Sequence, residues 1–125
     1  MSLQELMQRF DQQLCHVWMV RTFLKHSDEG QEDEDLQEVY RTLYDFMHAL
    51  GPPLEQGDAD KYFRLARKKF PKFTQAVELF LEIQPEVSLH MNFRMAARSL
   101  QLAHQQLQHL LEQASAAPAG KEQSR

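Results

Sequence analysis

Residues 51–58 read Gly51-Pro52-Pro53-Leu54-Glu55-Gln56-Gly57-Asp58 and place two glycines and two prolines in the middle of the chain. Glycine costs roughly 1 kcal/mol inside a helix and proline about 3 kcal/mol, so both residue types favour the ends of helices. Long runs of helix-forming residues lie on either side. We therefore expect one helix to end at Gly51-Pro52-Pro53 and the next to begin at Asp58, whose carboxylate can cap the first turn.

The rest of the chain divides in the same way. Gly30 and Gly120 also fall between helix-forming stretches, and each stretch carries apolar residues at alternating spacings of three and four. Ser2, with Glu5 three residues later, is a predicted N-cap. Four amphipathic helices joined by short polar connections predict an all-α fold, an antiparallel up-and-down four-helix bundle. The expected helices cover residues 2–25, 36–50, 58 to about 80, and 85 to about 114.

Pro71 lies inside the third of these stretches. Its missing N–H removes the hydrogen bond to the Arg67 carbonyl, yet the apolar stripe continues across it from Phe63 to Phe80. We therefore expect the third helix to be kinked or broken at Pro71, and the continuous stripe favours the kink.

The composition of the 125-residue chain narrows the class of protein. Its 42% apolar content is enough for one core, so residues 1–114 are expected to form a single domain. Residues 115–125 lack large apolar side chains and are expected to be a disordered tail. No run is long and apolar enough to cross a membrane. The net charge of −4 disfavours nucleic acid as a partner, and the single cysteine, Cys15, fits a cytoplasmic location.

Several apolar side chains lie partly off the main stripes, as an interface would require. A wide buried face is the alternative interpretation. The favoured function is therefore non-catalytic protein–protein association, as a homodimer or an adaptor, without a cofactor. The apolar residues predicted for the contact are Trp18, Met19, Met91 and Met95.

Charge patterning supports the same function. Acidic residues gather between 28 and 35, and six basic residues gather between 61 and 72. In an up-and-down bundle these clusters lie toward opposite ends, farther apart than a Debye length, so they would pair between chains rather than within one. A solvated basic face is the alternative. The basic residues predicted for the contact are Lys61, Arg64, Lys68 and Lys72.

Arg21 occupies a position on the first apolar stripe where an apolar residue is expected. A buried guanidinium needs a partner. Glu38 lies at a similar height on the next helix, so an Arg21–Glu38 ion pair is predicted.

Two alternative functions rest on the histidines. A metal- or small-ligand-binding bundle would use Asp45, His48 and His104, although no strong metal-binding spacing occurs. An enzymatic alternative rests on Arg98-Ser-Leu-Gln-Leu-Ala-His104, which resembles the Arg-then-His spacing of helical HEPN-type ribonucleases. That resemblance implies RNA cleavage with Arg98 and His104 as catalytic residues.

Overall fold

The computed structural model describes residues 1–116, which are helical throughout except for short connections and contain no strand. The all-α prediction is therefore confirmed. The predicted number of helices is wrong, because the described part of the chain has five. The fifth, α2, forms inside the acidic connection. The helices are α1 (Leu3–His26), α2 (Asp28–Glu32), α3 (Glu34–Glu55), α4 (Ala59–Val87) and α5 (Met91–Ala116).

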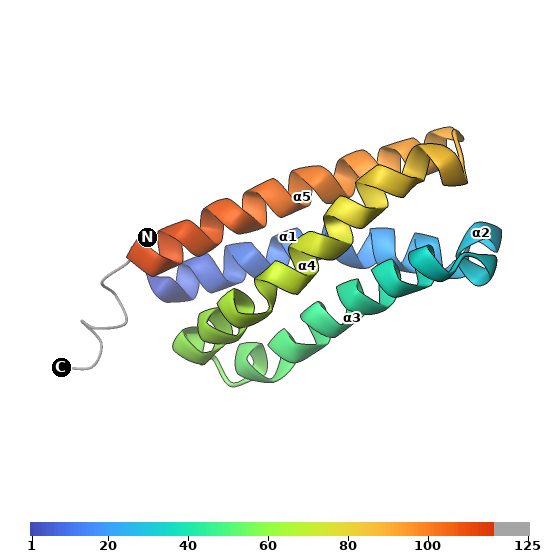
Figure 1. Ribbon diagram of the computed structural model, residues 1–125. Coiled ribbons are helices and arrows are strands. Elements are labelled where there is room, and N and C mark those ends of the chain that lie inside the picture. Colours follow the sequence, from blue (N-terminus) through green and yellow to red (C-terminus); the bar gives the residue numbers. More distant parts are fainter. Residues whose placement is uncertain (117–125) are drawn as a thin grey trace.

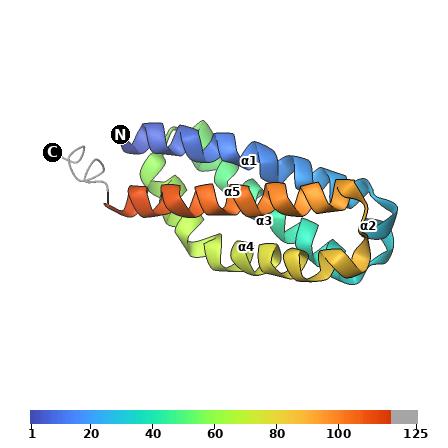
Figure 2. The ribbon, with the colours of Figure 1, turned by 90° about the horizontal axis from the view of Figure 1, so that it is seen from above.

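The four long helices run along the same axis of the molecule. Figure 1 shows α1 and α4 pointing in one direction and α3 and α5 in the other. Helix α1 packs against α3 and α5, and α4 packs against the same two helices. Seen from above in Figure 2, α5 lies over α3, with α1 and α4 on either side. This arrangement puts one apolar side of each helix into a common core.

The two predicted N-caps are confirmed. The Ser2 hydroxyl accepts from the Glu5 N–H at 3.1 Å, and the Glu5 carboxylate accepts from the Ser2 N–H at 3.0 Å. The Asp58 carboxylate accepts from the Lys61 N–H at 3.1 Å. Each cap satisfies backbone donors that a helix start leaves free.

Helix α3 continues through the Gly51-Pro52-Pro53 segment, so the end predicted there is wrong. The helix ends at Glu55, and the chain turns away at Gly57, whose φ of 67° is in the left-handed region that glycine adopts without strain. The Gly57 N–H donates to the Leu54 carbonyl at 3.1 Å, and the Asp58 N–H donates to the Pro53 carbonyl at 2.9 Å. These two bonds form a Schellman motif. A proline has no backbone N–H but keeps its carbonyl group, so it can accept a hydrogen bond at a helix end of this kind.

Helix α4 runs without interruption through Pro71 and Pro85. A break at Pro71 is therefore wrong, and a kink there stays a prediction. The last helix does not start near Pro85 either, because that residue belongs to the last turn of α4. Helix α5 begins instead at Met91. His90 caps it, since its ring Nδ1 accepts from the Asn92 N–H at 3.0 Å.

Ser27 joins α1 to α2. Its hydroxyl donates to the Leu24 carbonyl at 2.8 Å and accepts from the Gly30 N–H at 2.9 Å. Gly30 is buried in this turn, where an added Cβ would overlap the Leu24 carbonyl oxygen. Gly30 therefore permits a short helix where the sequence predicted only a polar connection.

One predicted boundary at the end of the last helix also needs correction. Ser115 and Ala116 belong to α5, so the tail predicted for 115–125 cannot begin at 115. Residues 117–125, including Pro118 and Gly120, lie outside the described residues. Within residues 1–116, no helix combines the length and apolar character that crossing a bilayer requires.

Candidate functional site

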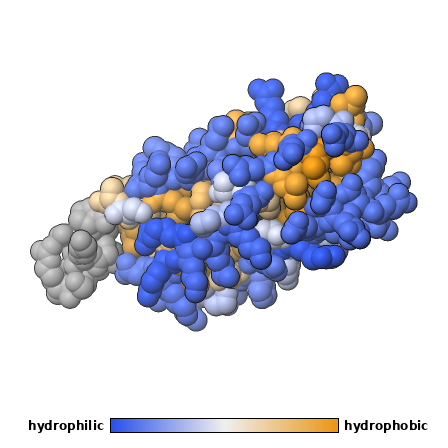
Figure 3. Space-filling model, in the orientation of Figure 1, coloured by the Kyte–Doolittle hydropathy of each residue, from blue (hydrophilic) through white to orange (hydrophobic). Residues whose placement is uncertain are grey.

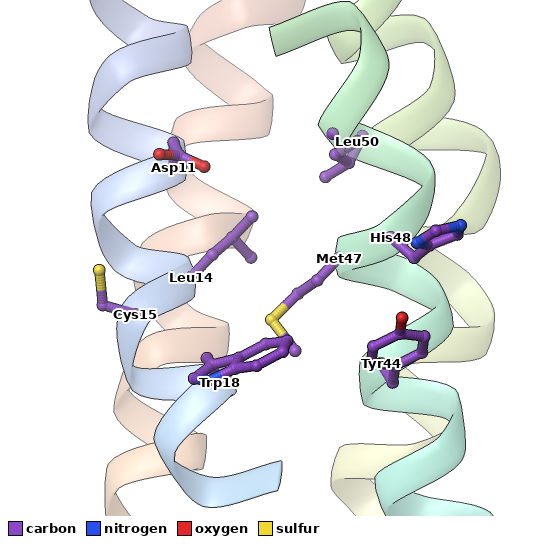
Figure 4. Close-up of a pocket in the computed structure, with 9 residues that line it drawn as sticks. Asp11, Leu14, Cys15, Trp18, Tyr44, Met47, His48 and Leu50 are labelled. Atoms are coloured by element: carbon purple, nitrogen blue, oxygen red, sulfur yellow. The ribbon is translucent and has the colours of Figure 1, made fainter. Parts of the chain in front are cut away.

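A hollow of about 350 Å³ lies on the surface between α1 and α3. Figure 4 shows Trp18 and Met47 pointing toward one another across the gap, while Cys15 and His48 lie at its outer flanks. We call it the aromatic hollow. Its lining residues are Asp11, Leu14, Cys15, Trp18, Tyr44, Met47, His48, Leu50 and Gly51.

Aromatic rings and a guanidinium form a stack at one end of the aromatic hollow. The Trp18 and Tyr44 ring centroids are 6.2 Å apart, and the Tyr44 and His48 rings stack at 5.5 Å. The Arg21 guanidinium carbon lies 4.7 Å from the Trp18 ring centroid and 4.8 Å from the Tyr44 ring centroid. Both distances are within the range of a cation–π contact. This stack connects α1 to α3.

A second hollow, of about 490 Å³, adjoins the first at Tyr44. Three cationic side chains and one carboxylate line it, so its formal charge is positive. We call it the basic hollow. Its lining residues are Arg21, Lys25, Tyr40, Arg41, Tyr44 and Asp45.

The predicted Arg21–Glu38 ion pair does not form within the described residues. Arg21 is only half-buried, its Nε has no hydrogen-bond partner, and ring faces occupy the place expected for a carboxylate. Glu38 lines a different hollow, which it shares with Val39 and Lys72. Helical phase explains the difference, since Glu38 and the ring of Tyr44 point to different sides of α3.

Asp11 is the ionisable group at the other end of the aromatic hollow. Burial raises the pKa of its carboxyl group above the ordinary value of 3.8. Tyr62 on α4 has a fully buried hydroxyl without a hydrogen-bond partner. Burial, and then the negative charge of Asp11, raise the pKa of Tyr62. Both shifts follow from the burial of these two groups beside the core.

Cys15 is exposed at the rim of the aromatic hollow. It belongs to the stretch Leu14–Val20 in the middle of α1, which is apolar almost throughout its sequence. The structure places only one side of it in the core, because Val17 is fully buried while Met19 is 64% exposed.

The residues of the predicted metal site do not converge. His48 flanks the aromatic hollow, Asp45 lines the basic hollow, and His104 packs against α4. Within residues 1–116, no three His, Cys, Asp or Glu side chains gather closely enough to hold a metal ion. The three side chains point in different directions around their helices. Their similar positions along the bundle axis do not reveal this difference.

His104 has a structural environment. Its Nε2 is 2.8 Å from the Thr74 hydroxyl oxygen, and its ring stacks on Phe70 at 5.1 Å and on Phe73 at 5.8 Å. Arg98, its predicted catalytic partner, is exposed and six residues earlier on α5. That spacing puts the two side chains about 120° apart around the helix. Within residues 1–116, Arg98 and His104 therefore do not face each other as the RNA-cleaving alternative would require.

The His104 environment predicts a pH dependence of stability. Burial lowers the pKa of His104 below 6.5, and the charge of Glu78 opposes this shift only in part. The folded state therefore favours the neutral ring, so its contribution is complete above about pH 6.5 and is lost as the pH falls through the lowered pKa. Urea unfolding between pH 5 and 7 should show this loss in the wild type.

His104→Gln should flatten the pH dependence, because glutamine can still bond to Thr74 but does not titrate in this range. The matched control is His109→Gln, which removes an exposed histidine from the same helix. An unchanged pH profile in His104→Gln would contradict the assignment.

The residues predicted for association fall into three places. Trp18 belongs to the aromatic hollow, whereas Met19, Met91 and Met95 are more than half exposed on α1 and α5. The third group is exposed along the first part of α4 and comprises Lys61, Arg64, Lys68 and Lys72. Lys68 and Lys72 also line a hollow of about 270 Å³ that contains Asp45.

Leu102 was missed by the sequence analysis. It is 53% exposed, and its spacing of eleven and seven residues from Met91 and Met95 puts all three on one face of α5. We call these three residues the α5 outer stripe. This spacing is present in the sequence, but the same helix carries a longer apolar stripe, which forms its core face and is the more obvious pattern.

Comparison of the chain with protein-family models, curated proteins and solved structures finds no match. The fold and the site define an all-α protein with two adjoining surface hollows between α1 and α3 and an exposed apolar stripe on α5.

Proposed function

We propose that this chain is a non-catalytic helical-bundle protein of the cytoplasm that acts by association, first of all with a second copy of itself. Residues 1–114 act as one domain in this proposal. The α5 outer stripe is the observation that carries it. Met91, Met95 and Leu102 are 57%, 54% and 53% exposed, and exposed apolar side chains in a row along a helix favour a helix–helix contact.

The surroundings of the stripe support an interface. The Phe23 and Phe93 rings are 5.0 Å apart, so the end of α1 that carries Met19 lies beside the start of α5. Figure 3 shows a broad apolar area toward the end where α4 joins α5 and a smaller one nearer the opposite end of the same face. Removing such surface from water stabilises a complex by roughly 25 cal/mol per Å² before the costs of association.

Charge complementarity favours a second copy as the partner. The acidic helix α2 lies at one end of the molecule, and the basic first half of α4 begins at the other end (Figure 1). Two copies packed side by side in opposite directions bring each acidic end to the basic half of its neighbour. The opposite charges then orient the two stripes relative to each other.

Met95→Glu is expected to raise the dissociation constant of the dimer at least tenfold, because it places a charge in the apolar contact. A tenfold change corresponds to about 1.4 kcal/mol. Sedimentation velocity from micromolar to millimolar concentration measures the constant. The matched control is Gln101→Glu, which adds the same charge at an exposed position of α5 outside the stripe.

Salt provides a second readout, since sodium chloride screens the contact between the acidic and basic ends and should weaken the wild-type dimer. A wild-type chain that stays monomeric throughout, or equal effects of the two glutamate variants, would remove the proposal.

A further inference from the structure

The charge of the basic hollow is suited to a dianion. Arg21, Lys25 and Arg41 contribute three positive charges and Asp45 one negative charge, which leaves a formal surplus of two. A phosphate monoester carries about −1.5 to −2 at pH 7, whereas a carboxylate would neutralise only one of these charges. Guanidinium and ammonium groups are the side chains that bind phosphate oxygens most strongly.

The Arg21 guanidinium is held in place by rings rather than by an acid. Trp18 and Tyr44 lie 4.7 and 4.8 Å from its central carbon. Its Nε has no hydrogen-bond partner, so no acceptor of the described chain neutralises this side. A guanidinium that is oriented by stacking loses little further freedom when it binds an oxyanion.

The aromatic hollow supplies the complementary surface for an aromatic body. Trp18 and Tyr44 are both more than a third exposed, and Met47 adds a polarisable thioether opposite Trp18 (Figure 4). The volume of about 350 Å³ falls in the range of small-molecule pockets. At its far end, the oxygens of the Asp11 carboxyl group can accept a hydrogen bond.

Because the two hollows meet at Tyr44, we propose that they bind one small aromatic phosphomonoester, the chemistry of a nucleoside monophosphate. The phosphate lies in the basic hollow and the aromatic body in the aromatic hollow. This site goes beyond the proposed self-association and does not rest on it.

Calorimetric titration of the full chain with AMP, adenosine and inorganic phosphate tests the site. AMP is expected to bind one-to-one, with a dissociation constant at least tenfold lower than that of adenosine or of phosphate. Trp18 is the only tryptophan of the chain, so its fluorescence should change with AMP and report occupancy of the aromatic hollow.

Arg21→Gln and Arg41→Gln should each weaken AMP binding at least tenfold. Arg41 is exposed, so its replacement keeps the test valid even if Arg21→Gln impairs folding. The matched control is Arg9→Gln, which removes an exposed arginine of α1 outside both hollows and should leave AMP binding unchanged.

Absence of AMP binding at millimolar concentration overturns the proposal. So does inorganic phosphate binding as tightly as AMP, because the aromatic hollow would then have no role. If Arg41→Gln weakens self-association while AMP does not bind, the basic hollow holds the acidic α2 of a second copy instead. That last result would leave the proposed function in place and remove only this site.

Discussion

Replacing Phe10 by alanine is expected to lower the free energy of unfolding by about 3–5 kcal/mol, the largest effect of any single substitution considered for this chain. Phe10 is fully buried, and its ring contacts three others that come from α3 and α4. The centroid distances are 6.3 Å to Phe46, 5.7 Å to Tyr62 and 5.7 Å to Phe63. Alanine would remove these contacts and leave a cavity at the point where three long helices meet.

Urea unfolding followed by circular dichroism measures the loss. Leu89→Ala is the control, because Leu89 is 67% exposed and its truncation should change stability by less than about 0.5 kcal/mol. A loss below about 1 kcal/mol in Phe10→Ala would contradict the packing described for this residue.

Gly30→Ala and Gly51→Ala are expected to change stability in opposite directions. An alanine Cβ at Gly30 would overlap the Leu24 carbonyl oxygen, a backbone atom that cannot move without shifting the end of α1. We expect a loss of about 1–3 kcal/mol, as for other overpacked positions. At Gly51, which lies inside α3, an added Cβ would meet no atom within 4 Å apart from its two chain neighbours and the backbone of its own helix. Alanine there should stabilise the fold by about 0.5–1 kcal/mol.

Each glycine variant serves as the control for the other, since both add the same methyl group to a helical glycine. The midpoint of urea unfolding, compared with the wild type, gives the sign in each case. Destabilisation by Gly51→Ala, or no loss in Gly30→Ala, would contradict the surroundings described for that glycine.

The helix starts at Ser2 and Asp58 could be predicted from sequence, whereas the end of α3 and the start of α5 could not. Ser2 and Asp58 cap their own helices through bonds that span three residues, so the local sequence contains all that is needed. The ends of the helices depend on more than the local sequence. Gly51, Pro52 and Pro53 remain helical, and the Pro53 carbonyl accepts one of the two hydrogen bonds of the Schellman motif around Gly57. Helix propensity alone predicts an end of α3 that is several residues too early.

The candidate site could be predicted only in part. The off-stripe positions of Met91 and Met95 indicated exposed apolar residues, and both are exposed. The partner of Arg21 could not be found in this way, because height along a bundle does not say which side of α3 a residue faces. The structure therefore puts Trp18 and Tyr44, rather than Glu38, beside the guanidinium.

The sequence by itself determined that this protein is all-α, approximately where its long helices lie, and that the helix starts at Ser2 and Asp58 are capped. These features depend on contacts within one helical turn or on the spacing of apolar residues along one helix. Only the tertiary structure decided that Gly30 sits inside a tight helical junction and that two hollows adjoin at Tyr44. Such features depend on how two helices are rotated against each other. Packing of the whole core sets that rotation, and no local stretch of sequence encodes it.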